Sequence, residues 1–256
     1  MRRVAVIGLG LMGGSIGLAA KARRLPWELV GFTRTPARGR EALRLGAVDR
    51  LCKTPAEAAA GADLVRACRP VLSTGHVLTD VGSTRAFLDR EIPRLLRGSG
   101  AVFIGSHPVA GSEQQGIGGA RGDLFNGATV LITPARWASA AAIARVTRFW
   151  RALGGRVAKM DSRRHDQILA RTSHLPHMVA SLLALTVGRQ PDRTAMGAYC
   201  GGGFADTSRV AEGSPEVWLD IVRTNRSNLA DELRAYRKQL DRLVAMLDKG
   251  NFIGIT

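Results

Sequence analysis

Glycines spaced for a phosphate-binding turn stand near the start of the chain. Gly8, Gly10 and Gly13 fit the pattern GxGxxG, directly after the apolar run Arg3–Ile7 and before a stretch that favours a helix. The first glycine permits a tight turn, the second lets a pyrophosphate approach the backbone, and the third allows close packing of helix on strand. Amide groups at the helix N-terminus then bind the negative charge. This spacing predicts a dinucleotide site, formed by Gly8, Gly10, Leu11, Met12 and Gly13.

The residues after the second expected strand bear on which dinucleotide binds. A site that prefers NAD usually ends this strand with Asp or Glu, which binds the ribose 2′-hydroxyl. Here Glu28–Phe32 is followed by Thr33 and Arg34, with no acid. Thr33 can donate a hydrogen bond and Arg34 can pair with a 2′-phosphate, with Arg38 as a further candidate. We therefore expect NADP in preference to NAD. The alternative, that these arginines are simply solvated and that NAD binds, stays open.

Four further blocks of polar residues follow along the chain, and Trp218 comes after them. They read DVGSTR at 80–85, GSHPVAGSE at 105–113, SHLPH at 173–177 and GGGFADTSR at 201–209. Taken in this order with the glycine motif, they closely resemble the prephenate and arogenate dehydrogenases of tyrosine biosynthesis. The resemblance extends from the glycine motif to the region of Asn228.

The resemblance implies an oxidative decarboxylation of prephenate or arogenate, two substrates that differ only in a side-chain keto or amino group. A hydride passes from the ring carbon that bears the hydroxyl to the nicotinamide, the ring carboxylate departs as carbon dioxide, and the ring becomes aromatic. His107 would hydrogen-bond the ring hydroxyl and accept its proton, which suits an imidazole that titrates near neutrality. Ser83 would link this histidine, the substrate and the nicotinamide, so it counts as both catalytic and cofactor-binding. A purely structural Ser83 would instead cap a helix over Thr84–Leu96.

The resemblance also implies a set of residues that recognise the substrate. Arg209 matches the family's carboxylate clamp, for which a planar and permanently charged guanidinium is suited. His174 matches a second substrate contact, while His177, one helical turn away, is interpreted as structural. The implied set is His174, Arg209, Ser112, Glu113, Asp206 and Trp218. Within this set, Glu113 would gate the pocket, Asp206 would orient Arg209 or a histidine, and Trp218 would form a pocket wall. For these three residues a role in packing alone stays open.

Alternating strands and helices are expected to position the first of these blocks. Short apolar runs alternate with segments whose apolar residues recur at helical spacing. This pattern indicates a Rossmann-type, doubly wound and mostly parallel sheet in an α/β fold. The expected strands are Arg3–Ile7, Glu28–Phe32, Val77–Val81, Val102–Gly105, Thr129–Thr133 and Val157–Met160. The expected helices between them include Met12–Ala22, Pro36–Leu45 and Ala138–Leu153.

The second half of the chain lacks strand alternation. Ser162–Leu185, Asp192–Cys200 and Pro215–Leu247 show apolar residues at helical spacing instead. We therefore expect a dinucleotide-binding domain at 1–161, followed by an all-helical substrate and dimerisation domain at 162–256. The leucines of the last helix can form a core or pack against a second copy, and a homodimer is favoured.

Composition narrows the class of protein. The chain has a formal charge of +16, but its arginines are scattered and aromatic residues make up only 5%, which argues against a nucleic-acid partner. The glycines that interrupt the apolar start argue against a signal peptide or a membrane span. Cys52, Cys68 and Cys200 form no CxxC pair and have no histidine at metal-ligand spacing, so we expect reduced thiols, no metal site and a cytoplasmic location.

One segment departs from the family pattern. After Ala62–Val65 the family continues a hydrophobic strand, a turn and a helix, whereas here Arg66–Pro70 leads directly to the next apolar run. Fewer than about twelve residues remain for a crossover that normally needs a dozen or more. Two arginines also fall where a buried parallel strand should be apolar. We expect a deletion near 66–75, and the alternative function is therefore a non-catalytic or impaired dimeric family member that has lost part of its cofactor site.

Overall fold

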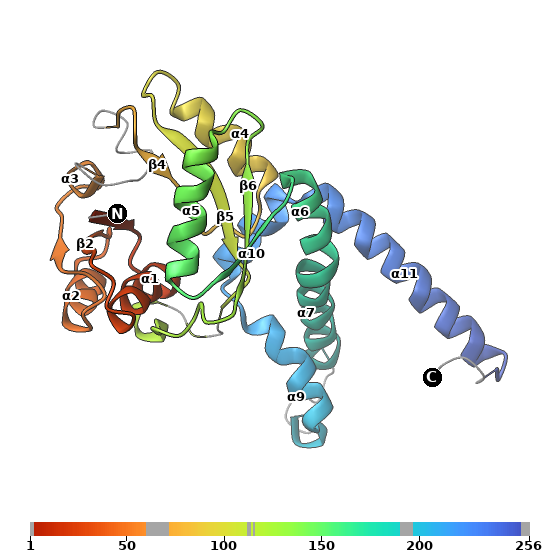
Figure 1. Cartoon of the computed structure of the whole chain (residues 1–256). Helices are drawn as coiled ribbons and strands as arrows, with labels where there is room; N and C mark the ends of the chain where they lie inside the picture. The colour runs from red at the N-terminus through yellow and green to blue at the C-terminus, as the bar shows by residue number, and fades with distance from the viewer. Residues whose placement is uncertain (1–2, 60–71, 112–113, 115, 190–196, 252–256) are drawn as a thin grey trace. The chain divides into compact units, whose positions relative to one another are not determined.

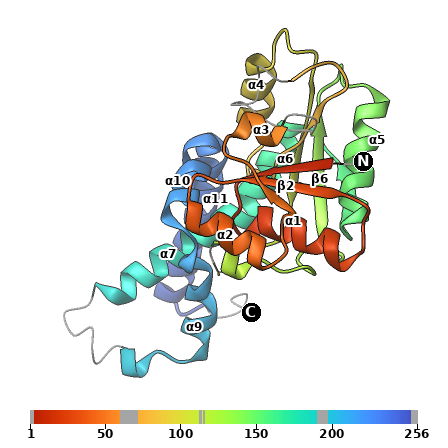
Figure 2. The same ribbon diagram turned by 90° about the vertical axis from the view of Figure 1, so that its left-hand side faces the viewer.

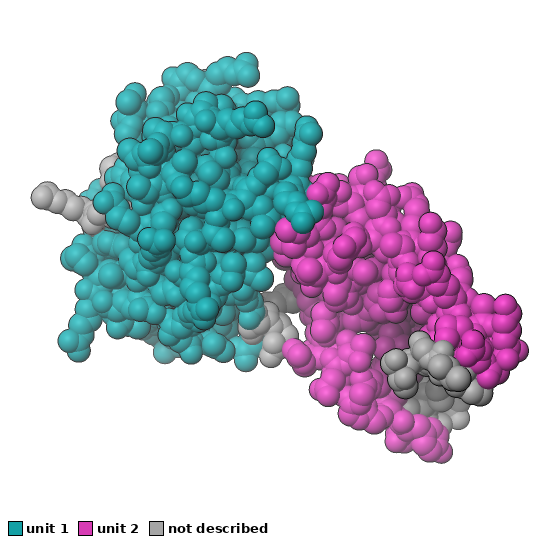
Figure 3. Space-filling view, turned by 45° about the vertical axis from the view of Figure 1, so that its right-hand side comes forward, with its two compact units in different colours: residues 1–165 teal, residues 166–256 magenta. Residues whose placement is uncertain are grey.

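The computed structural model describes residues 3–59, 72–111, 114, 116–189 and 197–251. The chain divides into two compact units, Met1–His165 and Asp166–Thr256, which Figure 3 colours separately. We refer to them as the N-terminal and the C-terminal unit. The division falls close to the domain boundary expected at residue 161.

The N-terminal unit begins with a parallel three-stranded sheet in the order β1-β2-β3 (Figure 1). β1 and β2 coincide with predicted strands, because each carries consecutive buried apolar residues, as a parallel strand covered on both faces should. The strands are β1 (Arg3–Ile7), β2 (Glu28–Phe32) and β3 (Arg50–Leu51). The helices that alternate with them are α1 (Leu11–Ala22), α2 (Pro36–Arg44) and α3 (Pro55–Ala59).

A second sheet of four strands, in the order β4-β5-β6-β7, completes the N-terminal unit. Its strands are β4 (Val77–Leu78), β5 (Val102–Pro108), β6 (Thr129–Pro134) and β7 (Arg156–Lys159). All neighbours run parallel except β5 and β6. Helices α4 (Ala86–Leu95) and α5 (Ala140–Ala152) lie on opposite sides of this sheet (Figure 2), and a short 3-10 turn covers Ile117–Gly119. The mostly parallel α/β architecture is thus confirmed.

Aromatic packing on α5 closes the core of the N-terminal unit. Trp150 is fully buried and meets Phe125 and Phe149 edge to face, with ring centroids 5.4 and 5.0 Å apart. Phe149 also stacks on Trp27 at 5.5 Å. Such pairs add to the free energy gained from burying apolar surface. They hold α5 in place beside the strands that carry the candidate site.

The C-terminal unit is entirely helical in the part that the structure describes, as predicted. Its helices are α6 (Ser162–Leu169, which begins in the N-terminal unit), α7 (Leu175–Gly188), α9 (Gly202–Arg209), α10 (Pro215–Thr224) and α11 (Arg226–Asp248). A π-helical turn, Ala170–His174, joins α6 to α7, and a 3-10 turn, Val210–Glu212, follows α9. Within the described helices, none is both long and apolar enough to cross a membrane.

Two predicted elements need correction, and two further predictions fall mostly on residues that the structure does not describe. The helix predicted over Pro215–Leu247 is divided at Asn225, whose φ and ψ of −119° and 24° are not helical. The strand predicted over Val77–Val81 ends at Leu78, because the chain turns there into the loop that carries Asp80. The predicted deletion near 66–75 and the helix predicted over Asp192–Cys200 fall largely outside the described residues.

Candidate functional site

The predicted phosphate cradle has the backbone that its glycines require. Gly8 follows β1 with a φ of +100°, a left-handed conformation that favours glycine, and its amide donates to the Phe32 carbonyl at 2.9 Å. A Cβ on Gly13 would overlap the Gly8 carbonyl oxygen, so only glycine lets α1 pack this closely on the turn. By contrast, a Cβ on Gly10 would meet no described atom within 4 Å apart from those of its two neighbours in the chain. The N-terminus of α1, beginning at Leu11 and Met12, therefore presents open backbone to an anion.

The residues predicted to select the cofactor lie in the loop between β2 and α2. Thr33 is half-buried, and its Oγ1 accepts a hydrogen bond from the Thr35 amide at 3.4 Å. Arg34 is exposed, and the loop contains no acidic residue. The loop can therefore offer a hydroxyl and a guanidinium to a ribose phosphate, and it has no carboxylate that would repel one.

A buried guanidinium organises the loop that carries Ser83. Arg85 has no solvent exposure; its Nη1 donates to Asp80 at 2.6 Å and its Nη2 donates to Asp89 at 2.8 Å. It also donates to the carbonyls of Gly82 and Ser106 and to the Thr133 hydroxyl. Asp80 in turn accepts the Ser106 amide at 3.1 Å and the Gly82 amide at 2.9 Å. The loop between β4 and α4 is thereby fastened to β5, one residue before His107.

Charge pairing keeps this guanidinium ionised in a dry site. Burial alone would lower the pKa of Arg85, but the nearby carboxylates of Asp80 and Asp89 raise it above its ordinary value. Burial raises the pKa of Asp89, and the attraction of Arg85 offsets only part of that effect. Gly105 belongs to the same arrangement, because a Cβ there would overlap the Arg85 guanidinium. The network thus explains why arginine stands at position 85 in the DVGSTR block and glycine at position 105 in the GSHPVAGSE block.

Ser83 is half-buried at the end of this loop. The residue that precedes α4 as its N-cap is Arg85, not Ser83, and the Arg85 side chain makes no capping hydrogen bond. Ser83 therefore does not serve as the helix cap that a purely structural reading would require. Its place beyond the carboxyl end of β4 is where ligand crevices of parallel sheets lie.

His107 lies near the end of β5, opposite Leu131 of β6. Its side chain is buried, and its Nδ1 lies 2.9 Å from Nε2 of the fully buried His165. The two rings meet edge to face, with centroids 5.0 Å apart. His165 was not identified from the sequence, since it lies 58 residues away on α6 and no spacing motif connects the two histidines.

The C-terminal unit holds a second arrangement of imidazoles around Trp218. His177 stacks on the indole with ring centroids 3.5 Å apart, and His174 meets it edge to face at 5.9 Å. Nδ1 of His177 donates to the Val210 carbonyl at 2.7 Å, and burial lowers the pKa of this imidazole. Both imidazoles therefore contact the same indole, and the structural role of His177 stays a prediction.

Asn225 fixes the hydrogen bonding of the buried His174. Its Nδ2 donates to the Asp166 carbonyl at 2.8 Å and lies 3.1 Å from Nδ1 of His174, while its Oδ1 accepts from Asn228. Because an amide nitrogen can only donate, Nδ1 of His174 is the acceptor, and the proton of the neutral ring sits on Nε2. Asn225 was also missed from the sequence.

Four predicted substrate-binding residues remain to be placed. Asp206 and Arg209 are exposed on α9, and among the described residues no ion pair joins them. Ser112 and Glu113 lie outside the described residues. The structure brings together the cradle, the Ser83 loop and His107 within the N-terminal unit, and His174 with Trp218 within the C-terminal unit.

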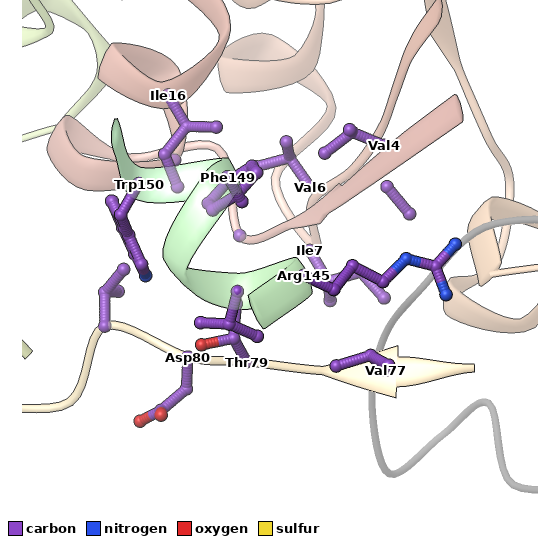
Figure 4. Close-up of a pocket in the computed structure, with 15 residues that line it drawn as sticks. Val4, Val6, Ile7, Ile16, Val77, Thr79, Asp80, Arg145, Phe149 and Trp150 are labelled. Atoms are coloured by element: carbon purple, nitrogen blue, oxygen red, sulfur yellow. The ribbon is translucent and has the colours of Figure 1, made fainter. Parts of the chain in front are cut away.

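A cavity of about 280 Å³ lies between β1 and β4 of the N-terminal unit (Figure 4). Val4 and Val6 line it from β1, Val77 from β4, and Phe149 and Trp150 from α5. Gly8 and Asp80 also border it, so the cavity runs from the cradle to the loop that precedes Ser83. In the described residues no strand bridges β1 and β4.

Comparison with known proteins agrees with both halves of this description. The model of the prephenate dehydrogenase nucleotide-binding domain matches residues 16–159, and that of the dimerization domain matches residues 161–252. A cyclohexadienyl dehydrogenase of Zymomonas mobilis is 33% identical, over 94% of this chain and 87% of that protein.

Solved structures show the same relationship. Prephenate dehydrogenase from Aquifex aeolicus, in complex with hydroxyphenyl propionate and NAD+, has a TM-score of 0.86 at 26% identity and covers 98% of this chain and 92% of that chain. Synechocystis arogenate dehydrogenase has a TM-score of 0.78 at 28% identity and covers 98% of this chain and 93% of that chain. With its glycine cradle, its buried His107 and matches across both units, the chain belongs to the prephenate dehydrogenase family.

Proposed function

We propose that the chain catalyses the oxidative decarboxylation of prephenate or arogenate, with hydride transfer to a nicotinamide cofactor. The observation that carries this proposal is the buried His107, which lies at the end of β5 in the unit that holds the cradle. Its relatives include proteins named prephenate, arogenate and cyclohexadienyl dehydrogenases. The alternative, a chain impaired by a deletion, is favoured by nothing in the described residues.

His107 is assigned the proton transfer. Its Nδ1 is engaged with His165, so Nε2 is the atom that would accept the hydroxyl proton of the substrate. As that proton leaves, the carbon gives up a hydride, the bond to the ring carboxylate breaks, and carbon dioxide departs while the ring becomes aromatic. When bound, the oxidised nicotinamide supplies the hydride acceptor. Ser83 is proposed to hold the histidine, substrate and nicotinamide together by hydrogen bonds.

The C-terminal unit is proposed to hold the substrate's charged groups. His174 would contact the substrate, and Arg209 would clamp a carboxylate through its planar fork. Trp218 would form a wall beside His174. Ser112, Glu113 and Asp206 complete the proposed substrate-binding set.

The cradle fits a dinucleotide, because Gly10 leaves open backbone where a pyrophosphate would approach. We propose that NADP binds more tightly than NAD, since Thr33 and Arg34 follow β2 without an acid. Arg34→Ala should weaken NADP binding about tenfold or more while leaving NAD binding unchanged. Arg40→Ala, an exposed arginine on α2, is the matched control in a fluorescence titration. Equal losses for both cofactors would overturn this preference.

We also propose that the chain forms a homodimer through its C-terminal unit. On α11, Leu229 is buried, whereas Leu243 and Leu247 are 38% and 51% exposed. Such an apolar stripe on a single protomer suits packing against a second copy. Light scattering should give twice the mass of 27.4 kDa for the wild type and the single mass for a Leu243→Asp, Leu247→Asp variant. Leu43→Lys, an exposed leucine of α2, is the control that should remain dimeric.

The test of the activity is absorbance at 340 nm with purified protein, prephenate or arogenate, and each of NAD and NADP. Reduced cofactor should form with the wild type, and His107→Asn should lower its rate by about 100-fold or more. If folded wild-type protein forms no reduced cofactor with any combination of substrate and cofactor, the proposal is overturned. The cytoplasmic location stays a prediction, which fractionation of cells can check.

A further inference from the structure

We propose that His165 is a positioning residue that fixes the tautomer of His107. The inference rests on the proposed function and deepens it. It starts from the fact that two nitrogens of two buried imidazoles, Nδ1 of His107 and Nε2 of His165, lie 2.9 Å apart. At that distance one of the two nitrogens carries a proton and the other accepts it.

Only one of the two arrangements lets His107 act as a base. If Nδ1 of His107 carries the proton, its Nε2 has a lone pair and can accept the substrate's hydroxyl proton. If His165 carries it on Nε2, then Nδ1 of His107 is the acceptor, Nε2 of a neutral His107 is protonated, and the base is lost. A neutral imidazole without a directing partner samples both tautomers. The hydrogen-bond acceptor on His165 therefore sets the fraction of His107 that is in the tautomer able to act as a base.

Rigid elements hold both rings in this relation. His107 is held by the backbone pairing between β5 and β6, where it lies opposite Leu131. His165 lies in the first turns of α6, where its amide donates to the Asp161 carbonyl at 2.8 Å. Oδ1 of Asp161 also accepts the amides of Arg163 and Arg164, which anchors the start of that helix. Side chains held on a strand and a capped helix keep their geometry better than side chains on loops.

The proton balance requires no further group. When His107 takes the hydroxyl proton on Nε2 it becomes an imidazolium, and its Nδ1 proton still points at Nε2 of His165. The same hydrogen bond that selects the tautomer before the reaction thus stabilises the positive charge that forms during it. His165 never touches the substrate in this scheme, so its effect on the rate passes through His107 alone.

The test compares two replacements at one position. His165→Gln places an amide oxygen near the former Nε2 and keeps an acceptor, whereas His165→Phe keeps a ring and removes it. We expect His165→Phe to lower kcat about 10- to 1000-fold with little change in KM, and His165→Gln to recover most of that loss. The control is His76→Gln, which changes a histidine of the same unit whose ring lies within hydrogen-bond distance of the nearby Ser73, and it should match the wild type.

Two further measurements separate positioning from mere packing. In a His107→Asn background, His165→Phe should cause no additional loss of kcat, because the residue acts through His107. In protein with ¹⁵N-labelled histidine, NMR should find neutral His107 protonated on Nδ1 in the wild type and redistributed toward Nε2 in His165→Phe. An unchanged His107 tautomer in His165→Phe, or a full additional loss in the double variant, would overturn the inference.

The NMR measurement also keeps the two proposals distinct. If the wild type fails to reduce either cofactor but the tautomer changes as expected, the proposed function fails and the control of His107 by His165 stands. If the wild type is active and the tautomer does not respond, the proposed function stands and the positioning role fails.

Discussion

Removing the buried charge of Arg85 should destabilise the N-terminal unit severely. The guanidinium has no exposure, while the side chains of Asp80 and Asp89 are 17% and 15% exposed. Arg85→Met would leave two largely buried carboxylates without their cation. Loss of one partner of a buried ion pair typically costs about 3–5 kcal/mol, because the remaining charge is desolvated and uncompensated. We expect a loss of this size in the free energy of unfolding at pH 8.

The free energy of unfolding of Arg85→Lys should lie between those of Arg85→Met and the wild type. Lysine keeps the charge, but its three donors cannot reproduce the guanidinium's contacts with Asp80, Asp89, Gly82, Ser106 and Thr133. At about 1 kcal/mol for each hydrogen bond lost, the expected cost is about 1–2 kcal/mol. The difference in unfolding free energy between Arg85→Met and Arg85→Lys therefore measures the effect of the positive charge, and the deficit of Arg85→Lys measures the effect of the guanidinium's geometry.

The deficit of Arg85→Met should depend on pH. Burial already raises the pKa of Asp89 above its unfolded value, and without Arg85 the attraction that opposes this rise disappears. A carboxyl group with a raised folded pKa favours the folded state at low pH, and this contribution is lost as the pH rises through the folded pKa. The deficit should therefore be smaller at pH 5 than at pH 8.

Urea unfolding followed by tryptophan fluorescence measures these differences. The matched control is Arg90→Met, which removes an arginine that is 57% exposed and paired with Glu91 on the same helix, and which should leave the unfolding midpoint unchanged. An Arg85→Met protein that unfolds at the wild-type midpoint at pH 8 would refute the claim that the network stabilises the fold. A deficit that does not change between pH 5 and pH 8 would refute the part assigned to the carboxylates.

Three other outcomes follow from contacts in the two units. Gly13→Ala should weaken cofactor binding about tenfold or more in a fluorescence titration, because its Cβ would displace the Gly8 carbonyl; unchanged affinity would contradict the close packing of α1 on the turn. Burial depresses the folded pKa of His177, so its contribution to stability is present above the unfolded pKa of about 6.5 and is lost as the pH falls through the folded value. Melting curves of His177→Gln should accordingly depend less on pH below about 6.5, and an unaltered pH dependence would exclude this imidazole as the cause. Asn225→Leu should raise KM for the substrate more than it lowers kcat, because it frees the tautomer of His174; equal effects on both parameters would assign Asn225 to stability alone.

The sequence allowed the sheet elements near the cradle to be predicted well. β1 and β2 match their predicted bounds because a parallel strand covered on both faces shows an uninterrupted apolar run, and glycine spacing located the turn. The break at Asn225 was missed for a physical reason. The leucine spacing continues across it, and backbone hydrogen bonds run on both sides, from Asn225 to Ile221 and from Leu229 to Asn225.

The residues that support the candidate site were harder to predict than the site itself. His107 stands in a recognisable block, but His165 is identified only when α6 lies against β5, and nothing in its local sequence signals that pairing. From the sequence alone, Arg85 was only the last residue of the DVGSTR block. Its role depends on Asp89, one helical turn later, and on strands β5 and β6, which only the folded structure brings together.

The π-helical turn Ala170–His174 makes this one place in the helical unit tolerant of a change in the number of residues. Such a turn holds one residue more than an α-helical turn, and its smaller rotation per residue absorbs the extra residue. Deleting one residue within this turn would let the backbone close into a regular α-helix, and the buried face of α7 marked by His177 and Ala180 would keep its direction. The same deletion in the first turn of α7 would instead rotate every following side chain by about 100°. The turn is therefore the position at which the length of the chain and the orientation of α7 are uncoupled.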